Sequence, residues 1–320
     1  MHRRLIDYFV VTLKGIAMGA ADVVPGVSGG TIAFISGIYE ELIESIEKVN
    51  LDAFKVLRQS GFKAAWHSLN GNFLASLFLG IAISIFSLAK IIKWLLLNEA
   101  VLLWSFFFGL VVASIIFIGK QIKGSNIAVI LAIMSSSILS YYITLAEPFA
   151  SPDSNIYLIF CGFLAIIAMI LPGVSGAFIL LILGAYQIAI ETINNLIEGI
   201  VTFNSDLFFD ALVKFLMIGL GAIIGLKLFS KVLNWMFKHH KNLTLAILTG
   251  FMIGSLNKIW PWKNVLTWRL NSDGIKIPLL EKSIMPSEFE GDSKIVLALI
   301  FMVIGFLTIF ILEKLGSKRP

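Results

Sequence analysis

The stretch PGVSGGTIAFISGIYE, residues 25–40, returns later in the chain as PGVSGAFILLILGAYQ, residues 172–187. The two stretches share nine of sixteen residues at a constant offset of 147 positions, which chance does not explain. A weaker match links GLVVAS at 109–114 with GFMIGS at 250–255. The chain is therefore predicted to be a tandem duplication, with a broken helix near the start of each half.

The composition indicates the class of protein. Of the 320 residues, 58% are hydrophobic and 14% are charged, and the mean hydropathy is +0.91. A soluble domain carries roughly a quarter charged residues, so an integral membrane protein is predicted. Apolar runs near the length of about 20 residues that spans a bilayer recur along the chain. They lack the alternation of a β-barrel, so the expected fold class is an all-α polytopic membrane protein.

Each half is predicted to contain a helix that enters PGVSG, a helix that leaves it, and three transmembrane helices. The first half, 1–146, has the re-entrant helix pair at 5–47, an amphipathic linker at 48–70, and helices at 73–93, 98–119 and 124–146. The second half, 147–320, has the re-entrant pair at 156–197, helices at 210–232, 242–259 and 294–313, and an external loop at 260–293. Whether each pair spans or re-enters, each half crosses the membrane an odd number of times. Two inverted repeats, a transporter architecture, are therefore expected.

The distribution of lysine and arginine predicts the orientation, because these residues mark the cytoplasmic side of a membrane protein. They occur near both ends of the chain and in the linker at 48–70, whereas the segments 147–157 and 198–209 contain none. The prediction is a multi-pass protein with both termini in the cytoplasm. Lys90 and Lys93 do not fit this scheme, and no role is predicted for them.

The PGVSG break is predicted to form a site for an anion. Ser28 and Ser175 are expected to cap the helices that follow the break. A helix N-terminus presents free N–H groups and a partial positive charge. Polar backbone at membrane depth lines a cavity or is buried in protein, and in inverted repeats the two N-termini meet near the midplane. The residues predicted to interrupt the helices are Pro25, Gly26, Pro172 and Gly173.

The residues predicted to bind the anion are Ser28, Gly29, Gly30, Thr31, Ser175 and Gly176, with Lys14 as a nearby cation. Asp22 precedes the first break, and its aligned partner in the second half is Met169. A carboxylate at membrane depth is costly and is a functional candidate by default. Two interpretations stay open: Asp22 exchanges a proton during transport, or Asp22 forms a structural ion pair with Lys14. A snorkelling role is the alternative for Lys14.

The sequence gives less support to an enzyme, a metal site or a nucleic-acid partner. GVSGG at 26–30 matches the G-x-S-x-G pattern of serine hydrolases and intramembrane proteases, but a serine nucleophile needs a nearby base. The four histidines, His2, His67, His239 and His240, all fall outside the apolar segments. The sequence therefore predicts no enzyme, no metal and no cofactor. Cys161 is the only cysteine, so no intrachain disulfide can form, and no basic cluster with interleaved aromatics predicts a nucleic-acid partner.

Two long motifs carry a family resemblance. GAADVVPGVSGGTIAFISGIYE at 19–40 and LPGVSGAFILLILGAY at 171–186 resemble the bacterial membrane family long called domain of unknown function 368, over essentially the whole chain. The resemblance implies translocation of undecaprenyl phosphate across the bacterial plasma membrane, which recycles the lipid carrier for cell-wall synthesis. A lipid phosphate is a small anion on an apolar tail, in keeping with the predicted anion site. A transporter or channel for a small soluble anion stays open as an alternative, and so does the oligomeric state.

Overall fold

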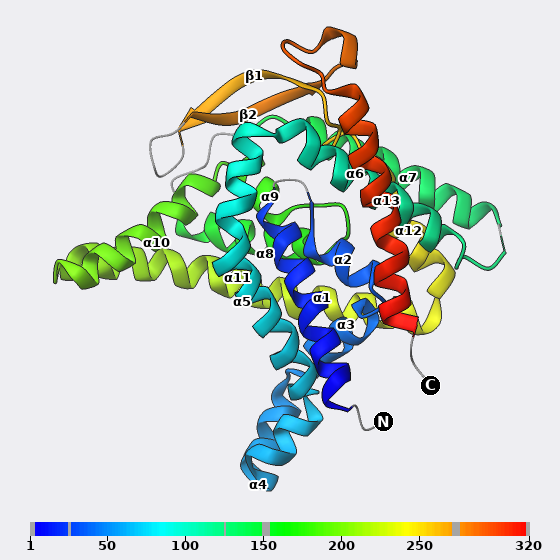
Figure 1. Ribbon diagram of the computed structural model, residues 1–320. Coiled ribbons are helices and arrows are strands. Elements are labelled where there is room, and N and C mark those ends of the chain that lie inside the picture. The colour runs from blue at the N-terminus through cyan, green and yellow to red at the C-terminus, as the bar shows by residue number, and fades with distance from the viewer. Residues whose placement is uncertain (1–3, 25–26, 125, 149–153, 271–275, 318–320) are drawn as a thin grey trace.

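The structure is a computed structural model that describes residues 4–24, 27–124, 126–148, 154–270 and 276–317 (Figure 1). It consists of helices and one small hairpin of strands. The helices up to residue 145 are α1 (Leu5–Val23), α2 (Gly29–Ile35), α3 (Tyr39–Lys48), α4 (Leu51–Ser68), α5 (Gly71–Asn98), α6 (Ala100–Gly119) and α7 (Ile127–Leu145). The later elements are α8 (Asn155–Ile170), α9 (Gly176–Ile182), α10 (Tyr186–Val201), α11 (Ser205–His239), α12 (Lys241–Ser255), β1 (Lys263–Leu270), β2 (Lys276–Ser283), a 3-10 turn (Pro286–Glu288) and α13 (Ile295–Ser317).

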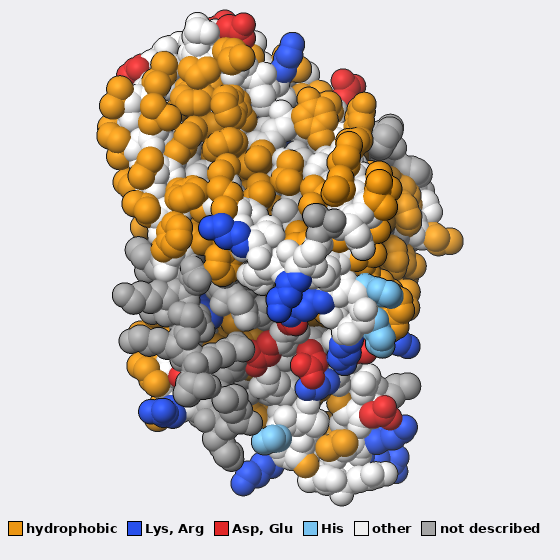
Figure 2. All heavy atoms as spheres, turned by 90° about the vertical axis from the view of Figure 1, so that its right-hand side faces the viewer, with side chains coloured by type: hydrophobic (Ala, Val, Ile, Leu, Met, Phe, Trp, Pro, Cys, Tyr) orange, Lys and Arg blue, Asp and Glu red, His pale blue; other side chains and the backbone are white. Residues whose placement is uncertain are grey.

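The predicted helical membrane fold is confirmed in its main features. Among the described residues, α5, α6, α7 and α11 are long and apolar enough to cross a membrane. A fifth span results if α9 and α10, which are bent by 108° relative to each other, count as one. On the face shown in Figure 2, apolar side chains form a broad belt, and charged side chains gather mainly at the end opposite the hairpin. This separation is typical of a polytopic membrane protein.

The long helices pack in two matching sets of pairs. Within each half, the helix that enters the motif packs against the long helix that follows the motif, so α1 lies on α5 and α8 lies on α11. The remaining helices exchange partners between halves: α6 lies on α13, and α7 lies on α12 (Figure 1). The matching pattern follows the duplication seen in the sequence.

Glycines allow these paired helices to approach closely. A β-carbon added at Gly80 of α5 would lie 2.1 Å from the Thr12 carbonyl oxygen of α1. One added at Gly109 of α6 would lie 1.9 Å from the Met302 carbonyl oxygen of α13. Small residues that admit a neighbouring backbone are typical of helix interfaces in membranes. Equivalent close approaches occur at Gly162, Gly221, Gly250, Gly254 and Gly305.

A second break follows each motif, and it differs from the sequence prediction of one helix leaving PGVSG. The chain leaves the first motif as the short helix α2 and then turns into α3, and it leaves the second as α9 and then α10. Gly37 and Gly184 stand at these turns with φ of +71° and +69°. Only glycine adopts this left-handed conformation without steric cost, so the repeated glycine in GIYE and GAYQ marks a helix end.

The hairpin lies at the opposite end of the molecule from the start of α1 and the end of α13 (Figure 1). Within the segment expected to be an external loop, β1 and β2 pair in antiparallel fashion. Two tryptophans hold the base of this hairpin: Trp262 Nε1 donates to the Ser293 carbonyl oxygen at 2.8 Å, and Trp260 Nε1 donates to the Ile284 carbonyl oxygen at 2.9 Å. The first turn of α1, the last turn of α13 and all of α4 lie toward the other end.

Candidate functional site

The two motifs contact each other directly. The Gly173 N–H donates to Thr31 Oγ1 at 2.9 Å, and Ser28 Oγ donates to the Met169 carbonyl oxygen at 3.2 Å. A β-carbon at Gly30 would lie 2.7 Å from the Ile170 carbonyl oxygen, so the backbones of the two motifs are in contact. Among the described residues, the two motifs therefore lie within about one helix diameter of each other, as predicted, whereas their place near the membrane midplane stays a prediction.

Both predicted serine caps are present. Ser28 is extended, with φ of −122° and ψ of 134°, and its Oγ accepts from the Gly30 N–H at 3.1 Å. Ser175 has a similar backbone, and its Oγ accepts from the Phe178 N–H at 3.4 Å. Gly173, with φ of +86°, makes the turn that leads from α8 to this cap. Pro25 and Gly26, predicted to break the first helix, lie outside the described residues.

Asp22 occupies the N-terminus of α2, a place that the sequence analysis assigned to the substrate. Its Oδ1 accepts from the Gly29 N–H at 2.6 Å, while its side chain is partly exposed. A β-carbon at residue 29 would lie 2.4 Å from Asp22 Oδ2. Glycine at this position therefore makes room for the carboxylate, which is favoured by the partial positive charge at a helix N-terminus.

Met169 holds the corresponding place over α9. A β-carbon at Gly176 would lie 2.4 Å from Met169 Cγ, just as a β-carbon at Gly29 would meet the Asp22 carboxylate. A thioether is a weak acceptor, and among the described residues no acceptor pairs with the N–H groups of Gly176 and Ala177. The two half-helices thus differ: α2 has its own anion, whereas α9 keeps two donors open.

Lys14 is buried and contacts the other end of α2. Its Nζ donates to the Ser36 carbonyl oxygen at 2.7 Å, and Ser36 is the C-cap of this helix. Seven residues of helix span roughly 10 Å, so Lys14 and Asp22 contact opposite ends of α2. Each side chain has the sign that complements the helix dipole at its own end. This arrangement offers a physical account of both charges that the sequence analysis did not consider.

Tyr39 is a further polar residue of the site, for which the sequence predicted no role. Its ring is 1% exposed and packs edge-on against Phe34, and its hydroxyl donates to the Ile170 carbonyl oxygen at 2.9 Å. This bond ties the start of α3 to the end of α8. The available signal was the identity of Tyr39 and Tyr186 in the repeated motif.

We expect Tyr39→Phe to weaken this connection without unfolding the protein. The substitution leaves a buried carbonyl group without its donor, which costs about 1–3 kcal/mol of folding free energy. The melting temperature in detergent should fall, while Tyr142→Phe, at a tyrosine that is 66% exposed, should leave it unchanged. Equal melting temperatures for wild type and Tyr39→Phe would show that the bond contributes nothing.

Among the described residues, the Ser28 hydroxyl has two hydrogen-bond partners, and both are backbone groups. Its hydroxyl donates to one backbone carbonyl and accepts from one backbone N–H, so neither of these partners can remove its proton as a base. His239 and His240 line a separate pocket with Lys123 and Asn242. In the described part of the chain, no group of three or more His, Cys, Asp or Glu side chains could hold a metal ion.

Comparisons with known proteins agree with the architecture. Residues 18–277 match the model of the VCA0040-like family, described as undecaprenyl phosphate translocase-like. A polyprenyl-phosphate transporter of Vibrio cholerae serotype O1 is 42% identical over 99% of this chain and 100% of its own length. A polyprenyl-phosphate transporter of Staphylococcus aureus is 30% identical over 80% of this chain and 88% of its own length. No solved structure matches. The chain is a multi-pass membrane protein, and it belongs to the undecaprenyl phosphate translocase-like family.

Proposed function

We propose that this protein transports a polyprenyl phosphate, undecaprenyl phosphate in particular, across the bacterial plasma membrane. Both curated relatives are named polyprenyl-phosphate transporters, and one of them matches along its full length. The direction proposed is from the outer to the inner leaflet, so that the carrier is recycled for cell-wall synthesis. The observation that carries the proposal is the direct contact of the two PGVSG motifs, through Thr31 and Gly173, inside a bundle of apolar helices.

The proposed scaffold is a pair of inverted repeats, 1–146 and 147–320, with re-entrant helix pairs and with both chain ends in the cytoplasm. The matching pairs α1·α5 and α8·α11, and the exchanged pairs α6·α13 and α7·α12, support this symmetry. The position of the described chain ends on one side, opposite the hairpin, supports the orientation (Figure 1). In such a scaffold the two short helices α2 and α9 approach the substrate from opposite sides.

In the proposed site, the phosphate binds first at α9. The open N–H groups of Gly176 and Ala177 and the hydroxyl of Ser175 supply donors there, and Ala177 is exposed. The Ser175 Oγ accepts from Phe178, which leaves its own proton for a phosphate oxygen. Backbone donors at a helix start suit a phosphate, and the apolar tail can remain in lipid.

The Gly29 N–H at the start of α2 can bind the phosphate only when Asp22 no longer accepts its hydrogen bond. Its carboxylate and the phosphate are both anions that compete for the Gly29 N–H, and two anions repel each other at short distance. We propose that protonation of Asp22 frees the Gly29 N–H for the phosphate, beside Gly30 and Ser28, and couples transport to pH. Lys14 balances the opposite end of α2 through its bond to the Ser36 carbonyl oxygen.

The test is reconstitution of the purified protein into liposomes with labelled undecaprenyl phosphate in the outer leaflet. We expect the label to become protected from an added, membrane-impermeant phosphatase faster than in empty liposomes. Undecaprenol, which lacks the phosphate, should move at the same rate with and without protein. Protection no faster than in empty liposomes would disprove lipid transport, and uptake of labelled inorganic phosphate would favour the soluble-anion alternative.

A further inference from the structure

Two lysines share a single carboxylate at the base of the hairpin. Lys258 Nζ lies 3.6 Å and Lys263 Nζ lies 3.7 Å from the same oxygen, Glu281 Oε2. The strand register explains the arrangement, because Lys263 pairs with Ser283, two residues beyond Glu281. Residues offset by two point to the same face of a strand, so both charges face the helices beneath the hairpin. The three side chains together carry one net positive charge.

Lys263 is a buried cation without a hydrogen-bond partner among the described residues. Its side chain is 6% exposed, and its Nζ has no hydrogen-bond partner among the described residues. Two contacts offset the cost of burying this charge. The Trp104 ring centroid lies 3.6 Å from Nζ, and Glu281 Oε2 lies 3.7 Å from it. An ammonium group carries three donors, and burial without acceptors is costly. Burial also lowers the pKa of Lys263 to about 8, against the opposing effect of Glu281.

Lys258 connects this cluster to the second PGVSG motif. Its Nζ lies 4.6 Å from the centroid of the Phe178 ring. Phe178 is the residue of α9 whose N–H is capped by Ser175. The side chain of Lys258 is 14% exposed and that of Glu281 is 18% exposed, so this edge of the cluster reaches the surface. The lysines therefore lie beside the half-helix whose donors are open.

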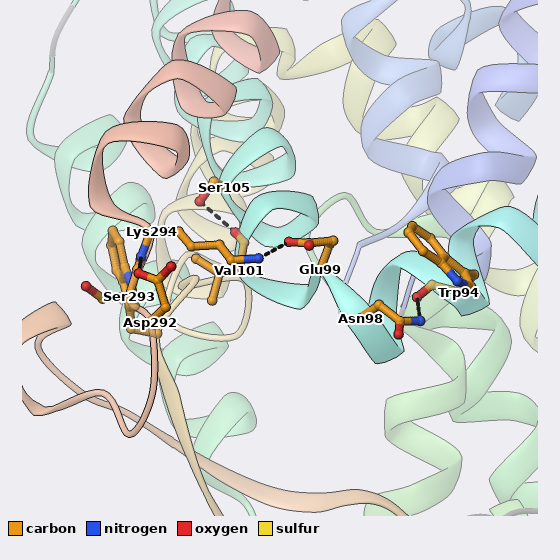
Figure 3. Close-up of polar contacts among 9 residues, drawn as sticks. Trp94, Asn98, Glu99, Val101, Ser105, Asp292, Ser293 and Lys294 are labelled. Carbon is orange, nitrogen blue, oxygen red and sulfur yellow. Dashed lines mark hydrogen bonds and ion pairs between the residues drawn. The ribbon is translucent and has the colours of Figure 1, made fainter.

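Glu99, the acid nearest in sequence to Trp104, is paired with another lysine. Glu99, at the start of α6 and five residues before Trp104, accepts from Lys294 at the start of α13 (Figure 3). The Asp292 carboxylate accepts from the Lys294 backbone N–H in the same view. Glu281 is thus the counter-ion that Lys258 and Lys263 share, and a second anion could bind there with favourable electrostatics.

We propose that Lys258 and Lys263 form a second binding site, for the phosphate monoester headgroup of an isoprenyl lipid, next to the first turn of α9. Glu281 is the built-in counter-ion of this site, as Asp22 is at α2. The site takes the headgroup on the hairpin side of the molecule and passes it to the donors of Ser175 and Gly176. The inference rests on the proposed function and assigns a role to the hairpin.

The test measures binding of farnesyl phosphate, a short isoprenyl phosphate, to the purified full-length protein in detergent by titration calorimetry. Loss of one charge-assisted hydrogen bond corresponds to roughly a tenfold to hundredfold change in affinity. We expect Lys258→Met and Lys263→Met each to weaken binding by about that factor. Glu281→Gln should instead strengthen binding, because it removes the competing carboxylate.

Lys282→Met is the matched control, since Lys282 is exposed, adjacent to Glu281 and on the opposite face of β2. It makes the same charge change and should bind farnesyl phosphate like the wild type. If a lysine variant fails to fold, the Glu281→Gln variant is the deciding test. If the cluster has a purely structural role, Glu281→Gln should lower the melting temperature and leave farnesyl phosphate binding unchanged or weaker. That result, or wild-type affinity in folded Lys258→Met, would overturn the site.

Two further probes identify the source of the phosphate. Farnesol should not bind at the cluster, and inorganic phosphate should bind more weakly than farnesyl phosphate. Equal affinity for inorganic phosphate would overturn the assignment to a lipid headgroup. The liposome assay separates this inference from the function: if the wild type transports undecaprenyl phosphate while both lysine variants bind farnesyl phosphate normally, only the second site is wrong.

The pH dependence of binding provides a readout specific to Lys263. A phosphate monoester is already doubly charged above about pH 7. Lys263, facing Glu281 and Trp104 with Lys258 beside it, has a pKa of about 8 and loses its charge above that pH. Wild-type affinity should therefore fall between pH 7 and pH 9, by the roughly tenfold factor expected for one charge-assisted hydrogen bond. The Lys263→Met variant should show no such fall, and a fall of equal size in that variant would contradict the assignment.

Discussion

Gly30→Val is expected to reduce undecaprenyl phosphate transport to the level of empty liposomes. A β-carbon at this position would lie 2.7 Å from the Ile170 carbonyl oxygen and 3.1 Å from the Met169 carbonyl oxygen. Both obstacles are backbone atoms, which cannot rotate away as a side chain can. Valine would therefore force α2 away from the second motif and break the contact of Ser28 with Met169. The measurement is phosphatase protection of labelled lipid in proteoliposomes.

The control for this experiment is Gly219→Val in α11. A β-carbon at Gly219 meets nothing within 4 Å, so the same substitution in a helix should leave transport intact. Matched melting temperatures for the two variants would show that the loss in Gly30→Val reflects the motif contact and not general unfolding. Wild-type transport by folded Gly30→Val would mean that the motif contact is not part of the transport site.

The second large effect is expected for Asp22→Asn, which should remove the pH dependence of transport. The carboxylate competes with phosphate for the Gly29 N–H, and an asparagine amide is neutral at every pH. A hydrogen bond to a charged group is worth about 1.5–3 kcal/mol, so the variant should bind phosphate about tenfold to hundredfold more tightly at high pH. Initial transport rates across a pH series, with wild type and variant in parallel, are the measurement.

Asp210→Asn is the corresponding control, because Asp210 is exposed and, among the described residues, pairs with Lys214 one helical turn away. It should retain the wild-type pH profile. A structural ion pair of Asp22 with Lys14 predicts a different outcome: poor folding of Asp22→Asn that improves when Lys14 is also changed to methionine. An unchanged pH profile in well-folded Asp22→Asn would refute proton exchange at this residue.

Much of the fold and part of the site could be read from the sequence. The duplicated PGVSG predicted that two loops meet, and the serines at 28 and 175 predicted their caps, because capping depends on residues near in sequence. The apolar runs predicted that α5, α6, α7 and α11 are long apolar helices, but α5 and α11 extend five or more residues beyond the predicted 73–93 and 210–232. The helix ends at Gly37 and Gly184 were missed, since the left-handed turns appear only in the backbone angles.

What the sequence did not reveal depends on contacts between distant segments. That Asp22 binds the start of α2, and that Lys14 binds its end, requires the chain to fold back at the break. The contact of Lys258 with Phe178 joins residues from different elements, and the pairing of Lys263 with Glu281 depends on a hairpin in a segment with no predicted structure. The positions of the charged residues in the sequence did not predict which residues these side chains contact.

The exchange of helix partners has a consequence for how the chain is made. During synthesis α6 and α7 enter the bilayer long before α13 and α12 leave the ribosome, so the Gly109 and Gly254 contacts can form only at the end of translation. Until then, the first half exposes two unmatched helix faces to lipid. Each half keeps its own α1·α5 or α8·α11 pair, but α6 and α7 find their partners only in the other half, an exchange that resembles a swapped dimer within one chain.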